Sequence, residues 1–369
     1  MNFSIIWQWL FTISHQKTFT KMTKPIITAL AAYGMSGLVF HGPLLLANSG
    51  FEIKKILERT KNISKDKHPA AEIVRDFEAI LYDEEIELVI INTPDYLHFD
   101  MVKQAIGKGK HVVVEKPITL KTEEANELIS LAKAKGIILS VFQNRRWDGD
   151  YLTVKKVVEG KMLGRLVEFE SHYDRYRNFI QEGTWKEESG AGTGVLYNLG
   201  SHMIDQVVDL FGMPKAITAD LRIQRTGGKV TDAYDLRLDY PELKVVLKCS
   251  YLAREPGPRY QLHGTEGSFT KYGIDPQEEM LKAGFLPIGN DWGTEPEQDW
   301  GFINTSINGL HVDGTVETEA GCYGEYYKNI YEAIREGAEL KVKPEQSRDV
   351  IKLIELAIES DNLKKTINI

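Results

Sequence analysis

Short apolar runs alternate with amphipathic segments along the first part of the chain. After Pro25 the apolar runs predict strands over residues 26–31, 51–57, 88–91, 111–114 and 137–142. The amphipathic segments between them predict helices over residues 35–48, 76–82, 96–108 and 122–135. Because the strands lack apolar–polar alternation, we expect both of their faces to be buried, as in a parallel sheet. Strands that are regularly separated by helices predict βαβ units and a doubly wound fold.

The pattern changes after residue 146. A helix is predicted over residues 151–159, and strands follow over residues 167–173, 216–224, 234–238, 243–251, 259–263 and 268–271. Glycine and proline turns separate these strands, which favours an antiparallel sheet. Helical periodicity returns over residues 323–336 and 345–360. The sequence therefore predicts an α/β protein with a doubly wound domain over residues 24–146 and an α+β domain over residues 147–369. The second domain contains a mainly antiparallel sheet, and the last helices can return to the first domain.

Residues 1–23 do not fit either domain. They contain Trp7 and Trp9 in a short apolar stretch, with no Lys or Arg before Ile5 and no small-residue cleavage site after it. This pattern argues against a secretory signal. Two interpretations stay open: an extension upstream of a start at Met22, or a helix that touches a membrane surface.

Composition narrows the class of protein. The 369 residues include 42% hydrophobic and 27% charged residues, with a net charge of −8. An acidic balance argues against nucleic-acid partners. Two cysteines fit a reducing cytoplasm, and no apolar run is long enough for a membrane span. The nine histidines form no metal-binding motif, and the nucleophile motif of serine hydrolases is absent, so we expect no metal site and no hydrolase.

The turn after the first predicted strand has the residues of a dinucleotide site. Ala32-Tyr33-Gly34-Met35-Ser36-Gly37 matches G-x-G-x-x-G with alanine in the first place. Such a turn presents backbone N–H groups and a helix N-terminus to a pyrophosphate. We expect Gly34, Met35 and Ser36 to approach the phosphates and Gly37 to let the helix pack on the sheet.

The end of the second predicted strand bears on the choice of cofactor. It reads Glu58-Arg59-Thr60-Lys61. An acidic residue at this place binds ribose hydroxyls, whereas arginine accommodates the 2′-phosphate of NADP. Arg59 and Thr60 favour NADP, with Glu58 turned aside, while NAD and a solvated polar loop remain alternatives.

Reactive side chains follow two later strands. Asn92-Thr93-Pro94 and then His98 follow residues 88–91, and Glu115-Lys116-Pro117 follows residues 111–114. Open α/β sheets bind ligands at the carboxyl ends of their strands. Lys116 is therefore well placed to project an ammonium group toward a substrate.

These motifs, taken in order, resemble the glucose–fructose oxidoreductase/inositol dehydrogenase/MocA (Gfo/Idh/MocA) family. The resemblance covers residue 24 to the end of the chain. Four further stretches resemble the subgroup that contains NADP-dependent scyllo-inositol 2-dehydrogenases: residues 141–150 (VFQNRRWDGD), 170–177 (ESHYDRYR), 196–206 (LYNLGSHMIDQ) and 271–278 (KYGIDPQE). The resemblance implies a Rossmann domain that binds NADP or NAD. It also implies an open sheet that covers the active site and often forms the interface of a homodimer or homotetramer.

The resemblance also implies roles for individual residues. Lys116 corresponds to the catalytic lysine and His202 to the catalytic histidine. Residues that match positions lining the nicotinamide are Thr93, Pro94, His98 and Glu115. The chain departs from the family at Ala32, where glycine is usual, and at Asn198, where aspartate is common. Asp205, on the same helical side as His202, could replace that aspartate in part.

Together these features predict hydride transfer between a nicotinamide cofactor and a CH–OH group of a cyclic polyol or sugar. His202 would act as the base, and Lys116 would hold the reacting oxygen by a charged hydrogen bond. The polar residues expected to contact the substrate are Lys116, Asn144, Arg145, Tyr173, Asn198 and His202. The arginine-rich stretches could equally form salt bridges between the domains. A catalytically silent NAD(P)- or sugar-binding regulator is the main alternative function, and a structural interaction protein is a third.

Overall fold

The first sheet of the protein is parallel and six-stranded. The computed structural model describes residues 24–369, so the segment that contains Trp7 and Trp9 lies outside the described residues. The sheet has the order β3-β2-β1-β4-β5-β6. Its strands are β1 (Ile26–Leu30), β2 (Phe51–Leu57), β3 (Glu72–Val74), β4 (Leu88–Ile91), β5 (His111–Val114) and β6 (Leu139–Val141). This strand order is that of a dinucleotide-binding sheet and confirms the predicted fold class.

The first helix differs from the uninterrupted one that we predict. Residues Gly37–His41 form a π-helical turn, which leads into α1 (Gly42–Leu46). The N–H of Gly42 bonds to the carbonyl of Gly37, five residues earlier. Pro43 follows at once, and proline disrupts the regular bonding of an α-helix because it lacks an N–H and its ring meets the preceding turn. The widened turn accommodates it.

The other helices of this part are α2 (Glu78–Leu81), α3 (His98–Gly107) and α4 (Thr122–Lys135). Gly136 ends α4 in the left-handed conformation, with φ of 63°. At the start of α4, Lys121 is the N-cap residue and its side chain forms no capping hydrogen bond. Glu355, far along the chain, accepts the N–H of Thr122 at 3.0 Å and its hydroxyl at 2.6 Å.

The second sheet has nine strands in the order β14-β13-β12-β11-β7-β10-β9-β8-β15. Its strands are β7 (Leu166–His172), β8 (Ala216–Arg222), β9 (Ala233–Asp239), β10 (Lys244–Ser250), β11 (Tyr260–Gly264), β12 (Gly267–Lys271), β13 (Gly301–Ile307), β14 (Leu310–Val316) and β15 (Ile367–Asn368). The pair β7–β10 is parallel and the other pairs are antiparallel, so the sheet is mainly antiparallel, as predicted.

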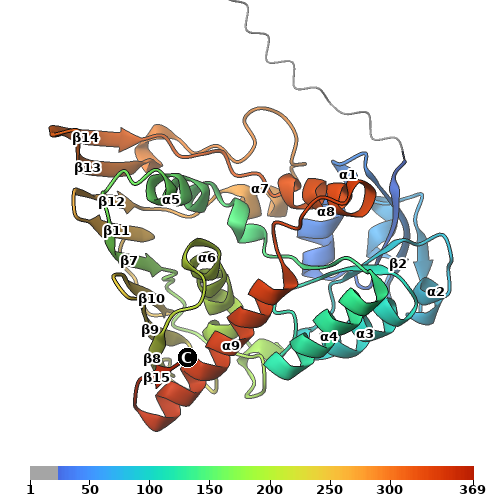
Figure 1. The fold of residues 1–369 in the computed structure, drawn as a ribbon. Helices are drawn as coiled ribbons and strands as arrows, with labels where there is room; N and C mark the ends of the chain where they lie inside the picture. Colours follow the sequence, from blue (N-terminus) through green and yellow to red (C-terminus); the bar gives the residue numbers. More distant parts are fainter. Residues whose placement is uncertain (1–23) are drawn as a thin grey trace, which may run out of the picture.

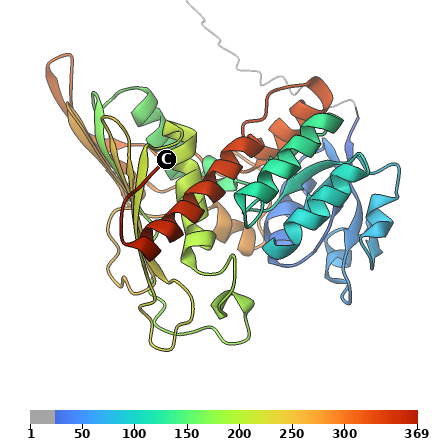
Figure 2. The same cartoon turned by 60° about the horizontal axis from the view of Figure 1, so that its bottom comes forward.

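Helices cover one face of this second sheet. They are α5 (Gly149–Glu159), α6 (Ser201–Phe211) and α9 (Pro344–Leu363), with the shorter α7 (Gln277–Lys282) nearby. Figure 2 shows the sheet edge-on, with these helices on the side that faces the first sheet. The opposite face carries no helix from the described part of the chain.

The C-terminal helices also contact the first sheet and its helices. In Figure 1, α8 (Gly324–Glu336) lies beside α1, and the guanidinium of Arg335 binds both carboxylate oxygens of Glu87 at 2.8 Å. α9 contacts the start of α4 through Glu355. Near the C-terminal end of α9, the hydroxyl of Ser360 accepts the N–H of Ala219 in β8 at 3.0 Å. None of the helices within residues 24–369 has the length and apolarity that crossing a membrane requires.

Candidate active site

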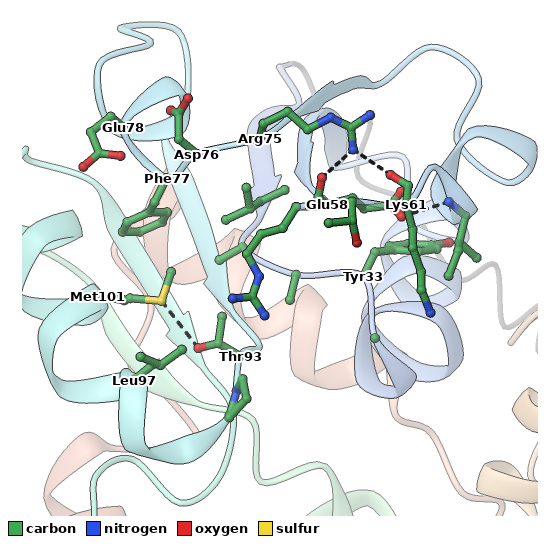
Figure 3. Close-up of a pocket in the computed structure, with 18 residues that line it drawn as sticks. Tyr33, Glu58, Lys61, Arg75, Asp76, Phe77, Glu78, Thr93, Leu97 and Met101 are labelled. Atoms are coloured by element: carbon green, nitrogen blue, oxygen red, sulfur yellow. Dashed lines mark hydrogen bonds between the residues drawn. The ribbon is translucent and has the colours of Figure 1, made fainter.

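Two adjoining cavities lie where β1, β4 and β5 end. The first has a volume of about 570 Å³ and the second of about 640 Å³. Both are lined by Ala32, Gly34, Thr93 and Pro94, so they form one continuous region. The first cavity extends past the end of β2 (Figure 3), whereas residues from both sheets line the second. This is the edge where open α/β sheets bind ligands.

The glycine turn forms a cradle between the two cavities. A Cβ added to Gly34 would meet no atom within 4 Å and would project into space that a ligand can use. The N–H of Leu38 bonds to the carbonyl of Gly34 at 2.9 Å, which leaves the earlier N–H groups of the helix without intrahelical acceptors. Met35 and Ser36, which belong to this turn, line the second cavity. These groups fit the pyrophosphate of a dinucleotide.

Gly37 and Asn92 explain how the turn tolerates Ala32. A Cβ on Gly37 would lie 2.8 Å from the carbonyl oxygen of Ala32, so only glycine permits this packing. Asn92 binds the backbone of Ala32 twice, accepting its N–H and donating to its carbonyl, each at 2.9 Å. The side chain of residue 32 takes no part in these bonds.

Glu58 lines the first cavity, but its carboxylate is engaged by the backbone and side chain of its own loop. It accepts the N–H groups of Ile63 at 2.8 Å and Ser64 at 2.9 Å, together with the hydroxyl of Ser64 at 2.5 Å. Burial raises the pKa of Glu58, but these hydrogen bonds outweigh burial and the net pKa lies below its ordinary value. The carboxylate is therefore ionised and committed to its own loop.

Arg59, Thr60 and Lys61 line the first cavity and are exposed. Figure 3 shows Arg75 beside this loop, where its guanidinium donates to the carbonyls of Glu58 and Lys61. Arg59 and Lys61 make no ion pair with any residue of the described chain. The loop therefore presents positive charge that the protein itself leaves uncompensated.

Lys116 lies at the wall of the second cavity, and its peptide bond to Pro117 is cis. Its Nζ donates to the carbonyl of Asn198 at 2.8 Å and reaches the side-chain oxygen of the same residue at 3.3 Å. Burial lowers the pKa of Lys116 to about 8; Glu115 opposes the shift, while Lys186 and Arg145 add to it. A lysine of this kind is charged at neutral pH and can lose its proton at moderate cost.

A hydrogen-bonded chain supports Glu115, the residue beside Lys116. The Nε2 of His41 lies 3.0 Å from the Oε1 of Glu115, and the Nδ1 of His41 lies 2.6 Å from the hydroxyl of Tyr327. Because a carboxylate only accepts, Nε2 of His41 donates to Glu115, and the hydroxyl of Tyr327 completes the chain at Nδ1. His41 and Tyr327 were not predicted, since 74 and 286 residues separate the bonded pairs and no local pattern joins them.

His202 also lines the second cavity. Its Nδ1 is buried and has no hydrogen-bond partner among the described residues. Burial lowers the pKa of His202 well below the ordinary value, and the cations of Lys116 and Arg145 add to the effect. The imidazole is therefore neutral near pH 7.

The suggestion that Asp205 assists His202 is wrong. Both carboxylate oxygens of Asp205 accept hydrogen bonds from Arg146, each at 2.7 Å. Asn198, which precedes His202 by one helical turn, contacts Lys116. Neither residue takes the place of an orienting aspartate, because each already has another partner.

The remaining predicted residues separate into two groups. His98, Glu115, Asn144 and Arg145 line the second cavity, and the ring nitrogens of His98 lie 2.7 Å from the carbonyl of Pro117 and 3.0 Å from that of Thr93. Tyr173 does not line either cavity. It is 1% exposed, and its ring lies among the guanidinium groups of Arg145, Arg175 and Arg259 at 5.3, 5.3 and 4.7 Å.

Comparison with known proteins places both parts of the chain in one group of enzymes. Residues 28–143 match the NAD-binding Rossmann fold of an oxidoreductase family, and residues 155–369 match the C-terminal alpha/beta domain of the same family. The scyllo-inositol 2-dehydrogenase (NADP(+)) IolW of Bacillus subtilis is 44% identical, over 93% of this chain and 95% of its own. The uncharacterized oxidoreductase YdgJ of Escherichia coli is 38% identical, over 94% and 99%. A crystal structure of a Bacteroides fragilis protein assigned as an oxidoreductase is 48% identical, with a TM-score of 0.87 over 94% of this chain and all of that one.

Proposed function

The chain belongs to the Gfo/Idh/MocA family of oxidoreductases with a nicotinamide-binding domain, and from this premise we propose that it moves hydride between NADP and a cyclic polyol or sugar. The reacting group is a secondary alcohol in one direction and a ketone in the other, as in scyllo-inositol and its inosose. The observation that carries the proposal is the joint presence of Lys116 and His202 in the wall of one cavity, next to the glycine turn.

The choice of NADP over NAD rests on the loop after β2. The Glu58 carboxylate, which would bind ribose hydroxyls, is occupied by Ile63 and Ser64. Arg59 and Lys61 supply unpaired positive charge to the same cavity. A phosphate group on the ribose provides the matching negative charge. The name of the B. subtilis relative, which specifies NADP, agrees with this choice.

Two side chains would handle the proton and the charge on the reacting oxygen. The nicotinamide ring, when bound, supplies the site that accepts or donates hydride. Lys116, charged at neutral pH, would donate a hydrogen bond to the substrate oxygen and stabilise the negative charge that develops on it. His202, neutral at the same pH, would accept the hydroxyl proton during oxidation and return it during reduction. Asn198 would hold the ammonium of Lys116 in place through the bonds that it already makes.

We further propose that the protein works as a homodimer or homotetramer. The face of the second sheet that no described helix covers supports this proposal, since sheet faces are usually buried by packing.

A panel of substrates and cofactors tests the function. Purified protein is assayed with inositols, inososes and aldoses, each with NADP and NAD separately, and we expect turnover with NADP and cyclic polyols. Lys116→Ala should bind NADPH with nearly unchanged affinity in a fluorescence titration but lose turnover, because it removes the charge at the reacting oxygen.

Lys121→Ala is the matched control, because this lysine is exposed and lies five residues further along the same segment. Unchanged turnover in Lys116→Ala would contradict the assigned role. A protein that binds NADPH but converts no member of the panel would instead be a silent regulator.

A further inference from the structure

The second cavity holds more positive than negative charge. Seven lysines or arginines line it, against four aspartates or glutamates. Three of the four carboxylates are already engaged. The ion pairs are Glu187 with Arg225 at 2.8 Å and Glu278 with Lys282 at 2.8 Å and with Arg145, while Glu115 forms a hydrogen bond with His41 at 3.0 Å.

Four of the cations have no carboxylate of residues 24–369 within ion-pairing distance: Lys116, Arg175, Arg177 and Lys186. Two of them are held by aromatic rings. The guanidinium of Arg175, which is half-buried, lies 5.3 Å from the ring centre of Tyr173, and that of Arg177 lies 5.7 Å from the ring of Tyr251. A guanidinium packed on a ring keeps its N–H edge free, and such an edge matches carboxylate and phosphate oxygens.

Arg175 and Arg177 belong to the wall that the second sheet provides. Their backbone N–H groups bond to the carbonyls of Ser250 at 2.9 Å and Tyr251 at 2.7 Å, which continue β10. The phosphates of a dinucleotide have other partners, at the glycine turn and at the loop of Arg59, and these come from the first sheet. The unpaired arginines therefore lie on the side of the cavity that remains for the substrate.

The positive field reaches the reacting groups. Burial and the cations of Lys116, Arg145, Arg259 and Arg175 together lower the pKa of His202. A neutral polyol would leave this charge uncompensated, whereas an anionic substrate would neutralise part of it. Clefts lined by one sign of charge also concentrate ligands of the opposite sign.

We propose that this cavity takes a polyol or sugar that carries a carboxylate or a phosphate, and that Arg175 and Arg177 select the anionic group. The inference rests on the proposed function and specifies its substrate class. The reaction itself is unchanged: a CH–OH carbon loses hydride to NADP⁺, its hydroxyl proton passes to His202 and then to water, and a carbonyl forms. The anionic group takes no part in the chemistry and serves only for binding.

Matched substrates test the proposal. D-Glucuronate and D-glucose 6-phosphate are compared with D-glucose, and myo-inositol 1-phosphate with myo-inositol, each with NADP⁺ and at two ionic strengths. We expect kcat/KM to be about tenfold or more higher for an anion than for its neutral parent, with the advantage reduced by salt. Preference for the uronate alone identifies a sugar acid as the natural class, and preference for the phosphates alone identifies a phosphorylated sugar.

Two variants assign the effect to the arginines. Arg175→Gln and Arg177→Gln should each lower the ratio of anion to neutral kcat/KM by about tenfold. Isothermal titration of the same anions into protein saturated with NADP⁺ should show a parallel loss of affinity. Arg254→Gln is the control, because Arg254 packs on Tyr176 outside the cavity and is exposed.

The failure of this inference differs from the failure of the proposed function. Turnover of the neutral parents, with no preference for anions and no change of ratio in the variants, would overturn the inference and leave the function standing. A second outcome is that no compound is oxidised, but the anions bind more tightly than their neutral parents and the variants lose that binding. This outcome would support the anion site and refute the proposed function. Equal binding of anions and parents would overturn the site as well.

Discussion

The substitution Arg146→Met removes a buried guanidinium and keeps a side chain of similar length. Arg146 is 5% exposed, and its Nε and Nη2 donate to the two carboxylate oxygens of Asp205. Its Nη1 donates to Asp209, to the carbonyl of Lys341 and to Gln346, each at 3.0 Å. One side chain thus joins α6 to the segment that enters α9.

The loss of this guanidinium should cost about 3–5 kcal/mol of unfolding free energy, because it leaves a buried charge without its partner. Asp205 is 1% exposed, so little water replaces the lost bonds. Burial already raises the pKa of Asp205, and Arg146 opposes that rise. Without Arg146 the pKa rises further, and the group becomes neutral as the pH falls through the new value. The destabilisation should therefore be larger at pH 8 than at pH 5.

Thermal unfolding followed by circular dichroism measures the effect. A loss of this size lowers Tm by about 6–10 °C at pH 8, given about 2 °C per kcal/mol for a protein of this size. The double variant Arg146→Met/Asp205→Leu should recover part of the loss, because it removes both charges. Arg222→Met, which breaks an exposed pair with Asp220, is the control and should change Tm by about 1 °C or less. A decrease below about 2 °C in Arg146→Met, or one that is equal at both pH values, would refute the reasoning.

Three further predictions concern the active site. Arg59→Ala should raise KM for NADPH about tenfold and leave KM for NADH unchanged, because it removes a charged hydrogen bond to the 2′-phosphate; equal increases in steady-state assays would contradict this. Ketone reduction should slow above about pH 8, where Lys116 loses its proton, and a flat profile of kcat/KM from about pH 6 to about pH 10 would exclude Lys116 as the charged donor. His41→Phe removes a hydrogen bond that keeps Glu115 ionised, and Glu115 raises the pKa of Lys116. The decrease in the rate of ketone reduction should therefore begin at lower pH in this variant. An unshifted pH profile would show that the hydrogen-bonded chain from Tyr327 does not affect Lys116.

Local pattern was sufficient for five of the six strands of the first sheet and for the residues at their ends. The apolar runs of β4 and β5 predict central strands of a parallel sheet, because apolar residues on both faces of a strand must be buried by elements packed on both sides of the sheet. Lys116 and Thr93 directly follow such strands, so their approximate place follows from the strand itself. The edge strand β3 was not predicted, because its three residues are too short to show a pattern.

The hairpin of β13 and β14 was missed although its turn carries a local signal. Asn308 and Gly309 both have positive φ, of 53° and 78°, and an Asn-Gly pair between alternating segments is typical of a hairpin. The exposed apolar residues of these strands, such as Phe302 and Leu310, obscured the alternation.

Contacts between distant segments could not be predicted. The partners of Asp205, Glu58 and Glu115 depend on which side chain the fold brings near, and each carboxylate had several candidates in the sequence. Tyr173 illustrates the limit. Its place in a stretch rich in polar residues suggested that it contacts the substrate. In the structure its ring packs against three guanidinium groups instead.

The return of the C-terminal helices to the first sheet has a consequence for the order in which the protein folds during synthesis. Tyr327, which completes the chain to Glu115, and Glu355, which caps α4, are made long after the strands that they support. Domains usually fold as units from the N-terminus as they emerge from the ribosome. Here we expect the nicotinamide-binding sheet to emerge from the ribosome before its packing is complete. It should reach its final packing only after α8 and α9 have been synthesised and have packed against it. A chain cut short before residue 324 would therefore contain every cofactor-binding residue predicted from the sequence, yet lack the support that holds Glu115 and α4.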